Sequence, residues 1–201
     1  QKGLIGAPQL AVMGSLGGLW SPDKVVADTP WRHDKLLGDG GGSIDIGVHI
    51  FHRLRTVFGE VAWVSAVART FEPTRYRRDD NGNVIETTQA NVDDTFLAVA
   101  GFENEALAQM LWSWALHGPS LEIPGAPYFY GSEGCIRCSD LVDNKGNSTA
   151  LMGHFEAGMT NEERERFFPY GLSDVFALNQ LDWLRAIEAG ADPETSGRGG
   201  L

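Results

Sequence analysis

The chain has 201 residues, 27 acidic against 16 basic side chains, and a formal net charge of −11. Apolar residues make up 42% of it and charged residues 21%, a composition typical of a globular protein with a real hydrophobic core. The acidic excess argues against nucleic acid or an anionic membrane as a partner. Because no apolar run approaches about 18 residues and no apolar leader is evident, the sequence predicts no membrane span and a cytoplasmic location.

The N-terminal part predicts one strand followed by a long loop. Apolar residues alternate within residues 8–20, which is the pattern of a strand. Prolines and a glycine cluster exclude long regular structure from residues 21–42. Trp31, Arg32 and Lys35 crowd the end of this loop. They form either a solvated connector or part of a binding site.

Residues 38–60 combine the glycine cluster with a helical pattern. One apolar stripe steps by four and three residues: Ile44, Val48, Phe51, Leu54 and Phe58. Asp45 and His49 lie one turn apart on a neighbouring stripe, where helix side chains are about 5–6 Å apart at Cβ. Ser43 is expected to cap this helix and Gly59 to end it.

The pair of Asp45 and His49 has two interpretations. It can be a local ion pair, or a buried histidine satisfied by a carboxylate. It can also bind a substrate, with His49 exchanging a proton with a hydroxyl and Asp45 orienting the imidazole. The spacing D-x-x-x-H alone is a weak motif and does not decide between them.

Strands dominate the middle of the chain. Residues 61–68 are apolar on both faces, which predicts a central strand covered on both sides. An Asn-Gly turn predicts a hairpin with strands at residues 74–78 and 84–89, interpreted as an exposed hairpin, an oligomer arm or a pocket lid. Residues 95–102 and 107–115 form a meander. Its second strand has one apolar face predicted to be buried: Ala108, Met110, Trp112, Trp114 and Leu116.

The remaining segments are less informative. His117, at the end of the second meander strand, is expected either to face a pocket or to lie in solvent. Cys135 and Cys138 have the spacing C-x-x-C but no second pair of ligands, so no metal site is expected. Residues 139–170 are expected to be an irregular insertion. An amphipathic helix is predicted between residues 172 and 190, packed on the sheet.

Residues 31–49, WRHDKLLGDGGGSIDIGVH, carry a specific resemblance. They are similar to the segment W-R-x-D…G-G-G-x-x-x-D-x-G-x-H that opens the substrate-binding domain of one oxidoreductase family. This is the family of glucose–fructose oxidoreductase, inositol dehydrogenase and the rhizopine catabolism protein MocA (Gfo/Idh/MocA). Further similar stretches follow in the family's order, at residues 59–66, 92–118, 131–137 and 181–193.

The resemblance implies a fold and a site. The fold is α+β: an open, mainly antiparallel sheet of about six to eight strands, with helices on one face and an oligomer interface on the other. Asp45 and His49 would line the substrate pocket beside the nicotinamide ring. Trp31, Arg32 and Lys35 would lie near its mouth, and His117 is a further candidate for contact with substrate.

The resemblance also implies a larger protein. In the family a dinucleotide-binding domain precedes this one, but neither a strand–GxGxxG–helix unit nor the family's Glu-Lys-Pro motif occurs here. Residues 1–201 are therefore expected to be a single substrate-binding and oligomerisation domain of an NAD(P)-dependent oxidoreductase. Its substrate would be a sugar, cyclitol or related hydroxyl compound. NAD or NADP would bind the full-length protein, and this chain alone is expected to be inactive.

Two alternatives remain open. The chain can be a stand-alone binding or scaffold module that kept the fold without the cofactor. It can also be part of a lyase that uses redox-assisted elimination. Under all three interpretations neither nucleic acid nor a membrane is expected as a partner, and a homo-oligomer through the open face of the sheet is expected.

Overall fold

The computed structural model describes residues 3–16, 29–117, 121–122 and 127–197. The chain forms two compact units, residues 1–148 and 149–201, which are described separately. The sequence-based expectation of one domain over residues 1–201 stays a prediction.

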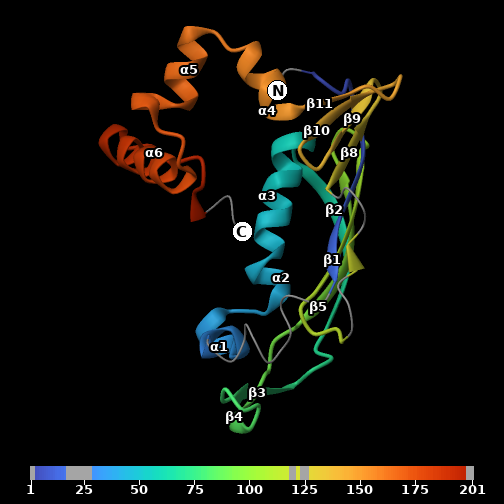
Figure 1. Ribbon diagram of the computed structural model, residues 1–201, viewed down its shortest axis with the longest axis vertical. Coiled ribbons are helices and arrows are strands. Elements are labelled where there is room, and N and C mark those ends of the chain that lie inside the picture. The colour runs from blue at the N-terminus through green and yellow to red at the C-terminus, as the bar shows by residue number, and fades with distance from the viewer. Residues whose placement is uncertain (1–2, 17–28, 118–120, 123–126, 198–201) are drawn as a thin grey trace. The chain divides into compact units, whose positions relative to one another are not determined.

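The first unit is built on one large sheet (Figure 1). Its strands have the order β11-β10-β9-β8-β1-β6-β5-β2, and β7 pairs with β1 beside this path. Their bounds are β1 Pro8–Leu16, β2 Val61–Arg69, β5 Thr95–Phe102, β6 Leu107–Ser113, β7 Leu121–Glu122, β8 Tyr128–Gly131, β9 Gly134–Arg137, β10 Asp140–Asp143 and β11 Ser148–Ala150. Strand β1 pairs with β6 in parallel, whereas β1 with β7, β1 with β8, β8 with β9, β9 with β10, β2 with β5 and β5 with β6 are antiparallel. The expected α+β class with a mainly antiparallel sheet is confirmed.

Helix α3 (Gly47–Phe58) covers one face of this sheet (Figure 1). It buries Ile50, Leu54 and Phe58 in the core. The Phe58 ring meets Phe102 edge-on at 5.3 Å between centroids and Phe129 at 6.1 Å. The predicted stripe was therefore wrong at its start, where Ile44 and Val48 are exposed. A kink at Ile46 separates α3 from the short helix α2 (Gly42–Asp45) and changes the register of the buried face.

The strands alternate between a face that packs on α3 and an open face. On β5, Phe96, Ala98 and Ala100 are buried, whereas Leu97 and Val99 are exposed. The predicted core face is confirmed within β6, where Ala108, Met110 and Trp112 are buried. Beyond the end of β6, Trp114 is buried as predicted, but Leu116 is only half-buried. We call the other side the open sheet face. It carries the exposed side chains Leu10, Trp63, Val67, Leu97, Val99, Leu107 and Tyr130.

Strand β2 does not have the place predicted for it. Of the described strands it pairs with β5 alone, at one edge of the sheet, and most of its residues are exposed. The prediction of a central strand covered on both faces was therefore wrong. A strand with apolar residues on both faces can lie in the centre of a sheet. It can also lie at an edge, where no other part of its own chain covers it.

The predicted hairpin is confirmed as β3 (Thr74–Arg78) and β4 (Val84–Gln89). In its turn, the Asp79 carboxylate accepts hydrogen bonds from the backbone N–H groups of Asn81 and Asn83, and Gly82 has a φ of 85°. Bonds from Asn83 hold the pKa of Asp79 below its ordinary value. The turn that begins at Asp143 repeats this arrangement, with Asn147 as donor and a lowered pKa for Asp143.

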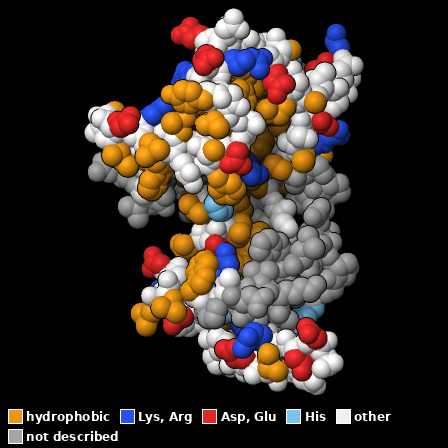
Figure 2. Space-filling model, turned by 60° about the vertical axis from the view of Figure 1, so that its left-hand side comes forward, with side chains coloured by type: hydrophobic (Ala, Val, Ile, Leu, Met, Phe, Trp, Pro, Cys, Tyr) orange, Lys and Arg blue, Asp and Glu red, His pale blue; other side chains and the backbone are white. Residues whose placement is uncertain are grey.

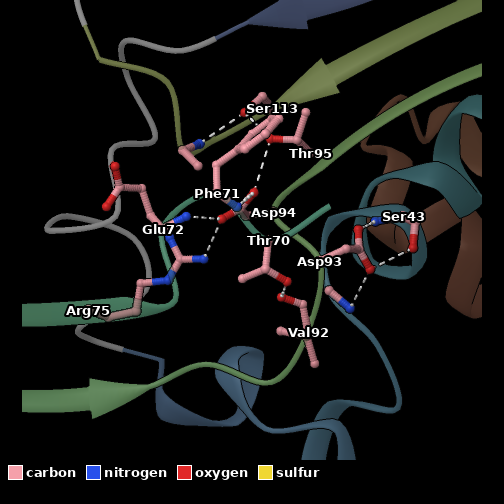
Figure 3. Close-up of polar contacts among 12 residues, drawn as sticks. Ser43, Thr70, Phe71, Glu72, Arg75, Val92, Asp93, Asp94, Thr95 and Ser113 are labelled. Carbon is pink, nitrogen blue, oxygen red and sulfur yellow. Dashed lines mark hydrogen bonds and ion pairs between the residues drawn. The ribbon is translucent and has the colours of Figure 1, made fainter. Parts of the chain in front are cut away.

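Asp94 connects the hairpin to the sheet (Figure 3). Its side chain is fully buried, and its carboxylate accepts hydrogen bonds from the backbone N–H groups of Phe71 (3.0 Å) and Glu72 (2.9 Å). It also accepts one from Arg75 Nη2 at 3.0 Å, which forms a buried ion pair, and one from the Thr95 hydroxyl. Burial lowers the pKa of Arg75 while Asp94 opposes that shift. The start of the hairpin is thereby tied to the first residue of β5.

The second unit consists of helices α4 (Leu151–Ala157), α5 (Asn161–Phe167) and α6 (Val175–Ala189), with a short 3₁₀ turn at Pro169–Gly171. The prediction of an irregular segment over residues 139–170 was wrong, since it contains β10, β11, α4 and α5. A capping box in which Thr160 and Glu163 exchange hydrogen bonds starts α5. The predicted C-terminal helix is confirmed as α6, and its packing on the sheet stays a prediction.

This unit leaves large apolar side chains exposed, among them Tyr170, Phe176 and Ile187, and Figure 2 shows hydrophobic side chains on the surface of the protein. Within the described part of the chain, no helix combines the length and the hydropathy needed to cross a membrane.

Candidate functional site

A hollow of about 400 Å³ lies beside α3, over the ends of β1 and β6. It is lined by Met13, Gly14, Ser15, Ile46, His49, Ile50, Arg53, Trp112 and Pro127. Its volume falls within the range of small-molecule sites, about 300–1,000 Å³. Most of its lining is apolar, and two polar side chains, those of His49 and Arg53, come from α3.

Trp112 forms an aromatic wall of this hollow. Its ring is buried, stacks on Phe96 at 6.0 Å between centroids and meets Trp114 edge-on at 5.0 Å. The backbone of Gly42 lies so close to the ring that a Cβ atom at this position would collide with it. A glycine is therefore required where α2 begins, and this close approach sets the distance between the helix and the sheet.

The start of α2 is bonded to Asp93, a residue that lies 50 positions after Ser43 and just before β5 (Figure 3). The Asp93 carboxylate accepts hydrogen bonds from the Ser43 backbone N–H and the Ser43 hydroxyl, both at 2.8 Å. The Asp93 carbonyl accepts one from the N–H of Gly42 at 2.9 Å. Ser43 was predicted as the cap, but it lies inside α2 and donates to Asp93, which satisfies the free N–H groups. A Cβ at Gly41 would collide with Asp93, so this glycine is required as well.

His49 is exposed on α3 and lines the hollow. Its ring has no hydrogen-bond or ion-pair partner among the described residues. Arg53 lies one turn further along the same helix, is also exposed, and likewise has no partner in the described part of the chain. Arg53 was not among the predicted site residues. The spacing of four residues from His49 was the available signal, because it places both side chains on one face of a helix.

Asp45 contacts Arg32 rather than His49. The Arg32 Nε donates to Asp45 Oδ2 at 2.9 Å, and its guanidinium lies 4.3 Å from the centre of the Trp31 ring. Three predicted site residues thus form one cluster, at the end of α2 and in the 3₁₀ turn Pro30–His33. Between Asp45 and His49, both of which the structure describes, there is no hydrogen bond, and Asp45 does not line the hollow.

Lys35 and His117 lie outside the hollow. Lys35 opens the short helix α1 (Lys35–Gly38), where its backbone N–H donates to Asn91 Oδ1 at 2.7 Å and its side chain is exposed. His117 is 80% exposed, and its Nε2 lies 2.6 Å from Glu72 Oε1. The structure therefore brings together Trp31, Arg32 and Asp45, places His49 at the hollow without a contact to Asp45, and leaves Lys35 and His117 outside its lining.

The hollow offers hydrogen bonds and positive charge to a ligand. An imidazole can donate to or accept from a hydroxyl, and a guanidinium donates in a fixed planar fork. Among the described residues that line the hollow, none carries a carboxylate. In the described ranges there is also no group of three histidine, cysteine or acidic side chains that could hold a metal ion.

The fold belongs to a defined class of protein. The model of the Gfo/Idh/MocA C-terminal domain matches residues 1–137, and the chain belongs to this oxidoreductase family. It is similar to levoglucosan dehydrogenase of Pseudarthrobacter phenanthrenivorans, with 25% identity over 155 residues. The aligned part covers 67% of this chain and 39% of that protein.

Solved structures of levoglucosan dehydrogenase have the same fold. The apo form matches with a TM-score of 0.67 and 20% identity, over 99% of this chain and 55% of that one. A complex with NADH and L-sorbose matches with a TM-score of 0.66 and 19% identity, again over 99% and 55%. The chain thus spans about half the length, or less, of these relatives.

Proposed function

We propose that this chain is the substrate-binding part of a longer NAD(P)-dependent oxidoreductase that acts on a sugar, cyclitol or related hydroxyl compound. The observation that carries the proposal is His49, an exposed imidazole at the edge of a hollow with an aromatic wall, with no partner among the described residues. The relatives support it: levoglucosan dehydrogenase has been solved with NADH and L-sorbose. The family membership supports the oxidoreductase class.

The residues of this chain fit the substrate better than the dinucleotide. A hollow of about 400 Å³ suits a monosaccharide and is too small for a whole dinucleotide. The sequence has no G-x-G-x-x-G turn between a strand and a helix. We therefore assign NAD or NADP to another part of the full-length protein, where the nicotinamide ring would exchange a hydride with the substrate carbon.

The residues described here would bind and orient the substrate. His49 would hold a hydroxyl group and exchange a proton with it, and the apolar side of a sugar ring would pack on Trp112. Asp45 is held by Arg32 through Oδ2, which leaves Oδ1 available as a further acceptor for a hydroxyl. Trp31 and Arg32 would position Asp45, and Lys35 and His117 remain candidates for substrate contact in the assembled protein.

The test is an assay of the full-length protein with NAD and NADP against a panel of sugars and polyols, followed by the absorbance of the reduced nicotinamide. We expect turnover with at least one hydroxyl compound and inhibition by its oxidised product. Absence of turnover with either cofactor across the panel, in protein shown to be folded, would contradict the proposal and favour a binding module without catalysis.

We also propose that the open sheet face is an interface with a second copy of the protein. It carries large apolar side chains that are about half exposed, including Trp63 (50%), Val67 (50%) and Leu97 (54%). These residues are adjacent across β2 and β5, since Val67 pairs with Leu97. A contiguous apolar surface of this kind is unusual on a monomer and is typical of an interface.

Sedimentation velocity of the full-length protein tests the interface. Leu97→Glu places a charge on the open sheet face between Val67 and Leu111 and should convert the oligomer to a monomer. Leu36→Glu is the matched control, because Leu36 is 92% exposed on α1 and lies away from this face. A wild-type monomer, or an oligomer that tolerates Leu97→Glu, would refute the interface.

A further inference from the structure

Arg53 differs from most arginines of the first unit in its surroundings. Arg32, Arg55, Arg75, Arg77 and Arg137 each form an ion pair with a carboxylate. Arg53 forms none in the described part of the chain, although acidic residues outnumber basic ones by 27 to 16. Arg53 instead lines the hollow, one helical turn from His49. A cation that no described carboxylate neutralises is available to a ligand.

The lining of the hollow favours an anion at this cation. None of the described lining residues is acidic, and Ile46, Ile50 and Trp112 make part of the surface apolar. An ion pair is stronger in such apolar surroundings than in open water. The planar fork of a guanidinium matches the two oxygens of a carboxylate, which gives direction as well as charge.

The spacing of two side chains on α3 limits the distance between the two groups of a ligand that contact them. His49 and Arg53 are four residues apart, so their Cβ atoms lie about 5–6 Å from each other on one helix face. Two groups a few bonds apart in a single small molecule can therefore contact both side chains. A hydroxyl fits the imidazole, and a carboxylate fits the guanidinium.

We infer that the hollow takes a hydroxy acid of the sugar-acid class, with its carboxylate bound by Arg53 and its reacting hydroxyl bound by His49. This inference rests on the proposed function and narrows its substrate class. Arg53 is a specificity-determining residue, and the carboxylate takes no part in the chemistry. The neutral sugar that lacks this carboxylate leaves the guanidinium without its partner and binds more weakly.

The experiment compares matched acids and neutral compounds on the full-length protein: D-glucuronate with D-glucose, and D-gluconate with D-glucitol. Calorimetry measures binding, and steady-state kinetics with NAD and NADP measures turnover. We expect the acid of at least one pair to bind about 10-fold or more tightly than its neutral partner. Arg53→Gln should reduce binding and kcat/KM of that acid by about 10- to 100-fold, the range of a charge-assisted hydrogen bond, and change the neutral compound less than about twofold.

Arg55→Gln is the matched control, since Arg55 lies on the same helix and pairs with Glu60 outside the hollow. It should leave the preference for the acid unchanged. Circular dichroism and thermal unfolding of both variants verify that each is folded.

The outcomes separate the inference from the proposed function. Binding of an acid that depends on Arg53 but is not followed by turnover would uphold the inference and contradict the oxidoreductase proposal. Turnover of neutral sugars that Arg53→Gln leaves unchanged would uphold the oxidoreductase and overturn the inference. An increase in the KM for NAD alone would assign Arg53 to a phosphate of the cofactor, and would also overturn it.

Discussion

Two regions of the first unit each contain an arginine, but one arginine is buried and paired and the other is exposed. In the cluster around Asp94, the guanidinium of Arg75 is 1% exposed and bound to a carboxylate that is fully buried (Figure 3). At the hollow, Arg53 and His49 are exposed and have no partner among the described residues. Buried charges require partners, because burial removes their hydration, and this is unfavourable unless hydrogen bonds within the protein replace the lost contacts with water. Exposed charges keep their hydration and remain free to bind a ligand.

The comparison separates residues that stabilise the fold from residues that are available for function. Asp94 accepts four hydrogen bonds, from Phe71, Glu72, Arg75 and Thr95, and these use its whole acceptor capacity. It has no capacity left for a substrate. The side chains of His49 and Arg53 have no hydrogen-bond partner in the ranges that the structure describes. Substitutions in the two regions should therefore change different measured quantities.

The largest effect is expected for Asp94→Ala. It leaves Arg75 as a buried cation without a partner, which typically lowers the free energy of unfolding by about 3–5 kcal/mol. Urea unfolding followed by tryptophan fluorescence measures this change. Asp80→Ala, an exposed residue of the hairpin turn, is the control and should change stability by less than about 0.5 kcal/mol. Equal stability of the two variants would refute a structural role for the Asp94 cluster.

His49→Ala should give the opposite result. Since His49 is exposed and has no partner in the described part of the chain, its loss should leave the free energy of unfolding within about 0.5 kcal/mol of the wild type. Loss of proton exchange and hydroxyl binding should lower kcat/KM of the full-length enzyme by about 10²- to 10⁴-fold. His52→Ala is the control, because His52 is exposed on the same helix but does not line the hollow. An unchanged kcat/KM in His49→Ala would remove His49 from the site.

Gly42→Ala tests the connection between packing and the hollow. The added Cβ collides with the Trp112 ring, so α2 or the ring must move, at a cost of about 1–3 kcal/mol. The same displacement should raise the KM for substrate. Gly47→Ala is the control, since its Cβ would meet only the Phe96 ring at 4.0 Å, and alanine is favoured in a helix by about 1 kcal/mol. Equal thermal stability of the two variants would contradict the close approach at Gly42.

The smallest effect concerns the turn at Asp79. Its pKa is lowered in the folded state, so the ionised carboxylate adds stability above the unfolded pKa, near 3.8. This contribution is lost as pH falls through the folded pKa. When the pH is lowered below about 4, the unfolding temperature of Asp79→Asn should therefore decrease by less than that of the wild type. Asp143→Asn, in the equivalent turn, should behave in the same way, and a profile identical to the wild type would exclude charge-assisted bonding in these turns.

Local patterns were predictable because neighbouring residues produce them. The hairpin of β3 and β4 follows from an Asn-Gly turn between two short strands, and the buried face of β6 follows from the alternation of its side chains. Helix α3 was expected from its apolar spacing and ends at Gly59, as predicted. The family resemblance, which rests on several motifs in one order, was confirmed over residues 1–137.

The contacts that join distant segments were decided by the tertiary structure. The N–H groups at the start of α2 bond to Asp93, which lies 50 positions after Ser43. No local sequence pattern predicts that bond. The sequence placed Asp45 and His49 within reach of each other, but the turn at Pro30–His33 brings Arg32 to Asp45 instead. The edge position of β2 and the entry of Arg53 into the hollow likewise depend on which strands pair. Periodicity determines which face of an element is apolar, whereas long-range pairing determines what that face meets.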